Sequence, residues 1–143
     1  FRYLSQNGAN STFVTLRDEI QFAAAYCYLF KIRYSDKITF DFNIEEQYLD
    51  HNLPPISLQP LIGNTVKHNT ISNKQPFKVR IFTEGGYLVV ANEKRPMLEP
   101  NPGTGVGLSN LNSRYQLLTE REIEIIDNEK EFIVRLPLEN LKQ

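Results

Sequence analysis

Apolar residues recur at helical spacing in three separate stretches of this chain. The first stretch opens with Thr15-Leu16-Arg17-Asp18, a pattern typical of a helix N-terminus, and predicts a long helix from Thr15 to Tyr34. Glu19 is expected to add negative charge to its first turn. We expect its core-facing stripe to consist of Leu16, Ile20, Ala23, Cys27, Phe30 and Tyr34. A second group of apolar side chains is expected to widen this stripe: Phe22, Tyr26 and Leu29.

Strict alternation of apolar and polar residues predicts strands in the rest of the chain. One strand is expected at residues 38–44, a hairpin at 77–90 around Gly85-Gly86, and a last hairpin pairing 123–126 with 132–136. Further helices are predicted at about 56–69 and about 107–119. This order of elements predicts an α+β fold: a two-layer α/β sandwich with a mixed, mostly antiparallel sheet and about three helices on one face.

Composition narrows the class of protein further. Sixteen basic and seventeen acidic side chains give a net charge of −1 without a long basic stripe, which argues against nucleic acid as a partner. The single cysteine, Cys27, is expected to be a buried thiol in a reducing compartment. No apolar run approaches the ~18 residues of a membrane-spanning helix. Because the chain begins at Phe1, we expect it to be a piece of a larger protein.

A glycine-rich stretch, Gly103-Thr104-Gly105-Val106-Gly107-Leu108, runs directly into the third predicted helix. Glycine lets the backbone approach a ligand closely. The free N–H groups and the dipole at a helix N-terminus attract anions. The stretch therefore predicts phosphate binding, although similar glycine patterns also occur in ordinary flexible loops.

A dinucleotide-binding fold is an alternative for the same glycines. Asp127 follows Gly107 by about twenty residues, where a ribose-binding acid is expected. However, residues 92–102 contain three prolines, whereas this fold requires a strand before its glycines. Too little chain follows Asp127 to complete a parallel sheet, so this alternative is disfavoured.

The second predicted helix carries a polar face. Asn64 and His68 lie four residues apart, and Lys67 lies beside them, so the three share one side of the helix. An amide oxygen suits Mg²⁺, which binds few protein ligands together with water and phosphate oxygens, and lysine supplies a positive charge. A solvated polar face with an incidental histidine is the alternative.

Together, these two stretches resemble the ATP-binding domain of sensor histidine kinases, the Bergerat or GHKL fold, and most of all the LytS type. Residues 58–68, Leu-Gln-Pro-Leu-Ile-Gly-Asn-Thr-Val-Lys-His, are similar to that family's N-box, Leu-Gln-Pro-Leu-Val-Glu-Asn-Ala-Ile-Lys-His. Residues 103–110 resemble its G2 box, and the helix at 15–34 follows its entry helix. The resemblance covers nearly the whole chain.

The resemblance implies a site for ATP and Mg²⁺. Asn64 would hold Mg²⁺, Lys67 and His68 would lie near the phosphates, and these three would form the catalytic set. Asn92 would occupy the place of the acid that reads the adenine amino group, and residues 93–102 would form a mobile lid. The triphosphate would lie against the G2 box: Gly103, Thr104, Gly105, Val106, Gly107 and Leu108.

The resemblance also implies a domain organisation and partners. Residues 1–14 would be the tail of upstream phosphoacceptor and dimerisation helices or a linker, and residues 15–143 the catalytic domain. The phosphoacceptor histidine would lie upstream in the same parent protein, and the phosphoryl group would pass on to a response regulator. The parent would be a homodimeric membrane sensor, with this domain in the cytoplasm.

Two substitutions depart from the family pattern. Gly63 stands where the family has a glutamate before the N-box asparagine, and Asn92-Glu93-Lys94 replaces Asp-Asn-Gly in the G1 box. A nucleotide-sensing pseudokinase and a docking module without nucleotide are therefore alternatives to an active kinase. If residue 63 matters for catalysis, restoring glutamate there is expected to raise activity.

Overall fold

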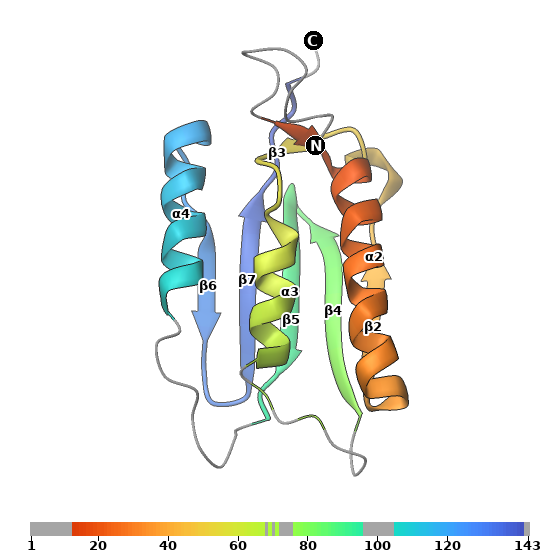
Figure 1. Cartoon of the computed structure of the whole chain (residues 1–143). Helices are drawn as coiled ribbons and strands as arrows, with labels where there is room; N and C mark the ends of the chain where they lie inside the picture. Colours follow the sequence, from red (N-terminus) through yellow and green to blue (C-terminus); the bar gives the residue numbers. More distant parts are fainter. Residues whose placement is uncertain (1–12, 68, 70, 72–75, 96–104, 142–143) are drawn as a thin grey trace.

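The computed structural model describes residues 13–67, 69, 71, 76–95 and 105–141. Three α-helices lie over a five-stranded sheet (Figure 1). The helices are α2 (Leu16–Tyr34), α3 (Leu58–Lys67) and α4 (Gly105–Thr119), with short 3₁₀ turns η2 (Ser35–Lys37) and η3 (Glu46–Tyr48). The strands are β1 (Val14–Thr15), β2 (Ile38–Asn43), β3 (Asn52–Leu53), β4 (Phe77–Glu84), β5 (Tyr87–Glu93), β6 (Glu124–Asp127) and β7 (Glu131–Pro137).

The main sheet has the order β2-β4-β5-β7-β6. Strands β2 and β4 pair in parallel, and every other neighbouring pair in this sheet is antiparallel. A separate two-stranded sheet joins β1 to β3. The predicted α+β sandwich with a mixed sheet is therefore confirmed. The dinucleotide-fold alternative is wrong, because that fold needs a parallel sheet.

The core lies between the helices and one face of the sheet. Phe77, Val79 and Ile81 of β4 point to the helices and are fully buried, while the residues between them are exposed or partly exposed. On the helical side of the core, α2 contributes Leu16 and α4 contributes Tyr115. The Tyr115 hydroxyl donates a hydrogen bond to the carbonyl oxygen of Pro137 at 3.0 Å. The alternating pattern of the sequence thus sets which face of the sheet is covered.

Helix α2 begins as predicted but is covered less widely than predicted. The Thr15 hydroxyl oxygen accepts the backbone N–H of Asp18 at 3.2 Å, which caps the helix. Cys27 is buried, and burial raises the pKa of its thiol to about 12. Leu29, however, is 60% exposed, and the neighbouring Tyr28 and Ile32 are exposed to a similar degree. The prediction that Leu29 widens the buried stripe is wrong, because no element covers that side of the helix among the described residues.

Glu19 lies in the first turn of α2, as predicted, but it is also buried. Its carboxylate accepts the backbone N–H groups of Ile56, Ser57 and Leu58 at 3.2, 2.7 and 3.0 Å. Burial raises the pKa of this carboxyl above its ordinary value, and those three donors and Arg114 oppose the rise. Glu19 therefore caps α3 from another helix, and it fixes the start of α3 relative to α2.

The remaining differences concern the ends of elements. Helix α3 starts two residues later and ends two residues earlier than predicted, and α4 starts at Gly105 rather than at residue 107. Gly85 and Gly86 have φ values of 57° and 88°, as a tight hairpin turn between β4 and β5 requires. Among the described residues, no helix combines the length and the apolar character that a bilayer span demands.

Candidate functional site

Three elements that are distant in the sequence end at the same side of the molecule. Figure 1 shows the C-terminus of α3, the N-terminus of α4 and the C-terminal end of β5 together at the lower edge of the fold. Helices α3 and α4 also contact each other directly. The fold therefore brings the predicted polar helix face, the start of the glycine-rich helix and Asn92 to one end of the helical layer.

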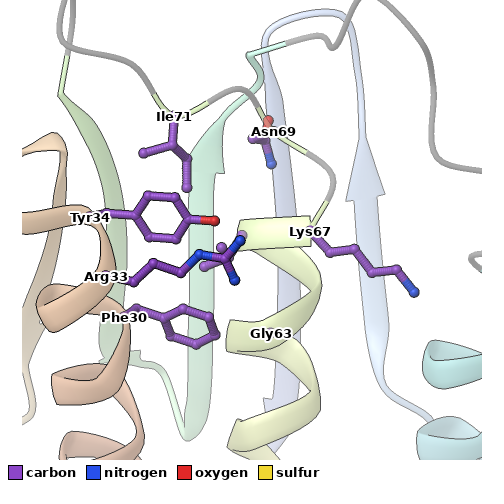
Figure 2. Close-up of a pocket in the computed structure, with 8 residues that line it drawn as sticks. Phe30, Arg33, Tyr34, Gly63, Lys67, Asn69 and Ile71 are labelled. Atoms are coloured by element: carbon purple, nitrogen blue, oxygen red, sulfur yellow. The ribbon is translucent and has the colours of Figure 1, made fainter.

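Asn64 and Lys67 lie on the outer part of α3. Val66 and Gly63 face α2, and Asn64 lies two residues before Val66, about 200° away around the helix. Asn64 is thus on the flank of α3 away from α2 and is partly exposed. Lys67 is exposed, and Figure 2 shows its side chain extending away from Arg33 and Tyr34 of α2. Among the described residues, Lys67 forms no ion pair, so its charge is available to a ligand.

Asn92 has an unusual environment at the end of β5. It lies opposite Val79 and Phe132 in the sheet, and therefore on the face that the helices cover. Its side chain is buried, at 3% exposure, and Nδ2 donates to the carbonyl oxygen of Glu93 at 2.9 Å. Oδ1 is buried, and no described residue donates a hydrogen bond to it. A buried acceptor without a donor costs about 1–3 kcal/mol, so it needs an explanation.

The segment after β5 is held on two sides. The backbone N–H of Lys94 donates to the carbonyl oxygen of Lys130 at 2.8 Å, and the Lys94 ammonium forms an ion pair with Asp127. The backbone N–H of Arg95 donates to Oδ1 of Asn69 at 2.7 Å. The chain that leaves Asn92 is therefore tied both to the β6–β7 hairpin and to the segment after α3. Residues 94 and 95 are thus held, unlike the mobile lid predicted over 93–102, and residues 96–102 lie outside the described residues.

The glycine-rich stretch is only partly within the described residues. Gly103, Thr104 and His68 lie outside them, and Gly105 and Val106 are described only as the first residues of α4. Gly107 is exposed, and a Cβ atom there would meet nothing within 4 Å. Leu108 is partly buried and packs against the core, which fits a role in anchoring the helix.

A pocket of about 460 Å³ opens between α2 and α3, on the opposite flank of α3 from Asn64. Its lining includes Phe30, Arg33 and Tyr34 of α2, and Gly63 and Lys67 of α3 (Figure 2). A Cβ atom on Gly63 would lie 2.9 Å from the hydroxyl oxygen of Tyr26. Residue 63 therefore faces α2, and the hydroxyl of Tyr26 occupies the space next to it.

The contacts of two polar residues at the opposite ends of α3 were not predicted from the sequence. Glu19 lies at the spacing of the buried stripe, three residues after Leu16 and four before Ala23, and a charged residue at such a position is a usable signal. Asn69 lies two residues after the end of α3, where asparagine is common, but nothing in the local sequence indicates its contact with Arg95. Among the described residues, no cluster of three or more His, Cys, Asp or Glu side chains could hold a metal ion.

Comparison with known structures identifies the class of fold. The structure resembles the cytoplasmic segment of histidine kinase QseC, with a TM-score of 0.60 and 17% sequence identity over 92% of this chain and 78% of that one. It also resembles the catalytic domain of histidine kinase ThkA, with a TM-score of 0.59 and 18% identity over 88% of this chain and 94% of that one. The fold is that of a histidine kinase catalytic domain.

Sequence comparison identifies a homologous protein. The chain is a homologue of the sensor histidine kinase/phosphatase LytS of Staphylococcus aureus, at 29% identity over 76% of this chain. This confirms the resemblance predicted from the N-box and the G2 box. The chain spans 22% of the length of that relative. No family model matches the chain.

Proposed function

We propose that this chain is the ATP-binding domain of a two-component sensor histidine kinase. It binds ATP with Mg²⁺ for phosphoryl transfer to a histidine in an upstream part of the same parent protein, which then phosphorylates a response regulator. The parent is proposed to be a homodimeric membrane sensor that carries this domain in the cytoplasm. The homology to LytS and the shared fold support this proposal.

The unpartnered Oδ1 of Asn92 is the observation that supports nucleotide binding most directly. The Glu93 carbonyl engages the amide nitrogen, so the side chain presents an acceptor to the site. The exocyclic amino group of adenine is a donor that would satisfy this acceptor. The residue thus fits the adenine end of ATP even though it replaces the family's carboxylate.

The opposite end of the nucleotide would lie toward α3 and α4. When bound, ATP supplies the phosphoryl group, and catalysis of its transfer rests on orientation and neutralisation of charge. Asn64 offers an amide oxygen to Mg²⁺, and Lys67 and His68 offer positive charge or hydrogen bonds to the phosphates. The backbone amides of residues 103–107 would bind the triphosphate, with Leu108 anchoring the helix behind them.

Gly63 favours a second candidate function, a nucleotide-sensing pseudokinase. Without a carboxylate at residue 63, an active kinase would lack the group that the family pattern places beside the metal ligand. Loss of a general base typically slows a reaction by ~10²–10⁴-fold and can leave binding intact. A docking module without nucleotide is the remaining alternative.

Titration calorimetry with ATP and Mg²⁺ tests the proposal. Measurable heat of binding and a rise in melting temperature would support it. If ATP produced neither heat nor a thermal shift, the docking module without nucleotide would be the remaining function. Autophosphorylation of the parent protein with its phosphoacceptor helices then distinguishes kinase from pseudokinase.

A further inference from the structure

Asn69 joins two parts of the chain that the proposed nucleotide would bridge. It is buried, at 9% exposure, and both ends of its amide are used. Nδ2 donates to the carbonyl oxygen of Thr65 at 2.7 Å, and Oδ1 accepts the backbone N–H of Arg95 at 2.7 Å. Thr65 belongs to the last turn of α3, whereas Arg95 lies two residues beyond the end of β5.

A side-chain amide suits this pair of contacts, because it carries a donor and an acceptor on one planar group. The last four carbonyl groups of a helix have no intrahelical donor, and Nδ2 supplies one to Thr65. A carboxylate at residue 69 would accept from Arg95 but would place an oxygen against the Thr65 carbonyl. An apolar side chain would leave both buried groups without partners, which is costly.

The contact restricts the spacing of the two halves of the candidate site. Asn64 and Lys67 lie in the last turns of α3, five and two residues before Asn69. Asn92 lies three residues before Arg95 and presents its free acceptor toward the helical layer. The Lys94 N–H is held by Lys130 of the β6–β7 turn, so this short segment has little remaining freedom. A ligand that spans both halves binds more tightly when their spacing is fixed beforehand.

We propose that Asn69 is a positioning residue for nucleotide binding, which locks the metal-binding end of α3 to the base-reading end of β5. This inference rests on the proposed function. Asn69 acts through its neighbours and contacts neither base nor phosphate itself. Its contribution is therefore expected only for ligands that reach both halves of the site.

The test compares ligands that bridge the site with ligands that do not. Asn69→Ala should raise the Kd for ATP–Mg²⁺ about tenfold, while the Kd for adenosine, measured below the melting temperature, changes less than about threefold. A purely structural cap would lower the melting temperature and leave the ratio of the two Kd values unchanged. That outcome would overturn the inference.

Arg95 supplies a second variant and its matched control. Arg95→Pro removes the backbone N–H that Asn69 accepts, without altering α3, and should reproduce the selective loss of ATP affinity. Arg95→Ala keeps that N–H but removes the side-chain contacts to Glu93 and to the Pro76 carbonyl, so it should bind ATP more tightly than Arg95→Pro. The double variant Asn69→Ala with Arg95→Pro should bind ATP no more weakly than either single variant, because both remove the same hydrogen bond.

The proposed function and the positioning role of Asn69 are tested separately by these measurements. If the wild-type chain binds no ATP, the proposed function is wrong and this inference falls with it. If the wild-type chain binds ATP but Arg95→Pro and Arg95→Ala have equal affinities, Asn69 is not a positioning residue and the proposed function stands.

Discussion

The hydroxyl oxygen of Tyr26 on α2 lies 2.9 Å from the position that a Cβ atom on Gly63 of α3 would occupy. Tyr26 is held in place by an edge-on contact with the ring of Phe30, at 5.1 Å between centroids. The glycine at residue 63 therefore lets two helices approach closely. A side chain there, including the family's glutamate, would require Tyr26 to move.

This contact predicts an energetic coupling between residues 63 and 26. Gly63→Ala should gain about 1 kcal/mol of helix propensity, but the contact with Tyr26 should cancel much of it. In a Tyr26→Phe background the same change should deliver nearly the full gain, because the obstructing oxygen is gone. Denaturant unfolding of the four proteins checks this, and equal effects of Gly63→Ala in both backgrounds would contradict it.

The same contact changes what we expect of Gly63→Glu. A buried overpacked side chain typically costs about 1–3 kcal/mol, so this variant alone should melt at a lower temperature. The double variant Gly63→Glu with Tyr26→Ala is expected to transfer the phosphoryl group faster than Tyr26→Ala alone, because the smaller residue 26 makes room for the carboxylate. Autophosphorylation of the parent protein carrying both changes, compared with Tyr26→Ala alone, measures it. An equal rate in both would show that residue 63 does not limit catalysis.

Asn92 should read the base through its free oxygen. Asn92→Ala is expected to weaken ATP binding by about 1–2 kcal/mol, because one hydrogen bond to a buried acceptor is lost. ITP carries a carbonyl in place of the adenine amino group, so the wild-type chain should bind it more weakly than ATP. As a control, the ratio of the ATP affinity to the ITP affinity should approach one in Asn92→Ala. An undiminished preference for ATP in that variant would assign base recognition to another residue.

Asn64 should contribute to metal-dependent affinity and little to folding. Asn64→Ala is expected to abolish the gain in ATP affinity that Mg²⁺ provides, while stability changes by less than about 1 kcal/mol, as for other partly exposed positions. Calorimetry with and without Mg²⁺ measures this, with Gln59→Ala on the same helix as the control. Severe unfolding of Asn64→Ala would mean that the residue is structural.

Glu19 should make stability depend on pH in a defined direction. Its carboxyl has a folded-state pKa above the ordinary 4.5, so the native state retains its proton over an interval in which the unfolded state has lost it. The free energy of unfolding that Glu19 contributes therefore falls as pH rises from about 4.5 through the raised pKa. Glu19→Gln lacks this titration and should be less stable overall, because its amide nitrogen cannot accept a backbone N–H of α3.

Chemical denaturation of wild type and Glu19→Gln between pH 4 and pH 8 measures the effect. The difference in the free energy of unfolding between the two proteins should narrow as pH increases over the titration interval. A difference that widens with pH would show that the hydrogen bonds from Ile56, Ser57 and Leu58 outweigh burial and lower the pKa instead.

Hydrophobic periodicity in the sequence was sufficient to predict the main elements and their faces. Leu58, Leu61, Ile62 and Val66 recur on one side of α3 and are buried, and the alternating residues of β4 show which face is covered. The N-box and G2 box also predicted the fold family, because such motifs combine residue type with helix position. These features are local, so a short stretch of sequence contains them.

The contacts that distinguish this chain were decided by tertiary structure. Glu19 meets α3 across 37 to 39 residues, and Asn69 meets Arg95 across 26. Periodicity states that a face is apolar, but it does not say which polar group from a distant segment will be buried there. The free oxygen of Asn92 and the space beside Gly63 likewise exist only because separate elements pack together. The sequence determined the elements and the fold family, and the packing of those elements decided how the candidate site is held.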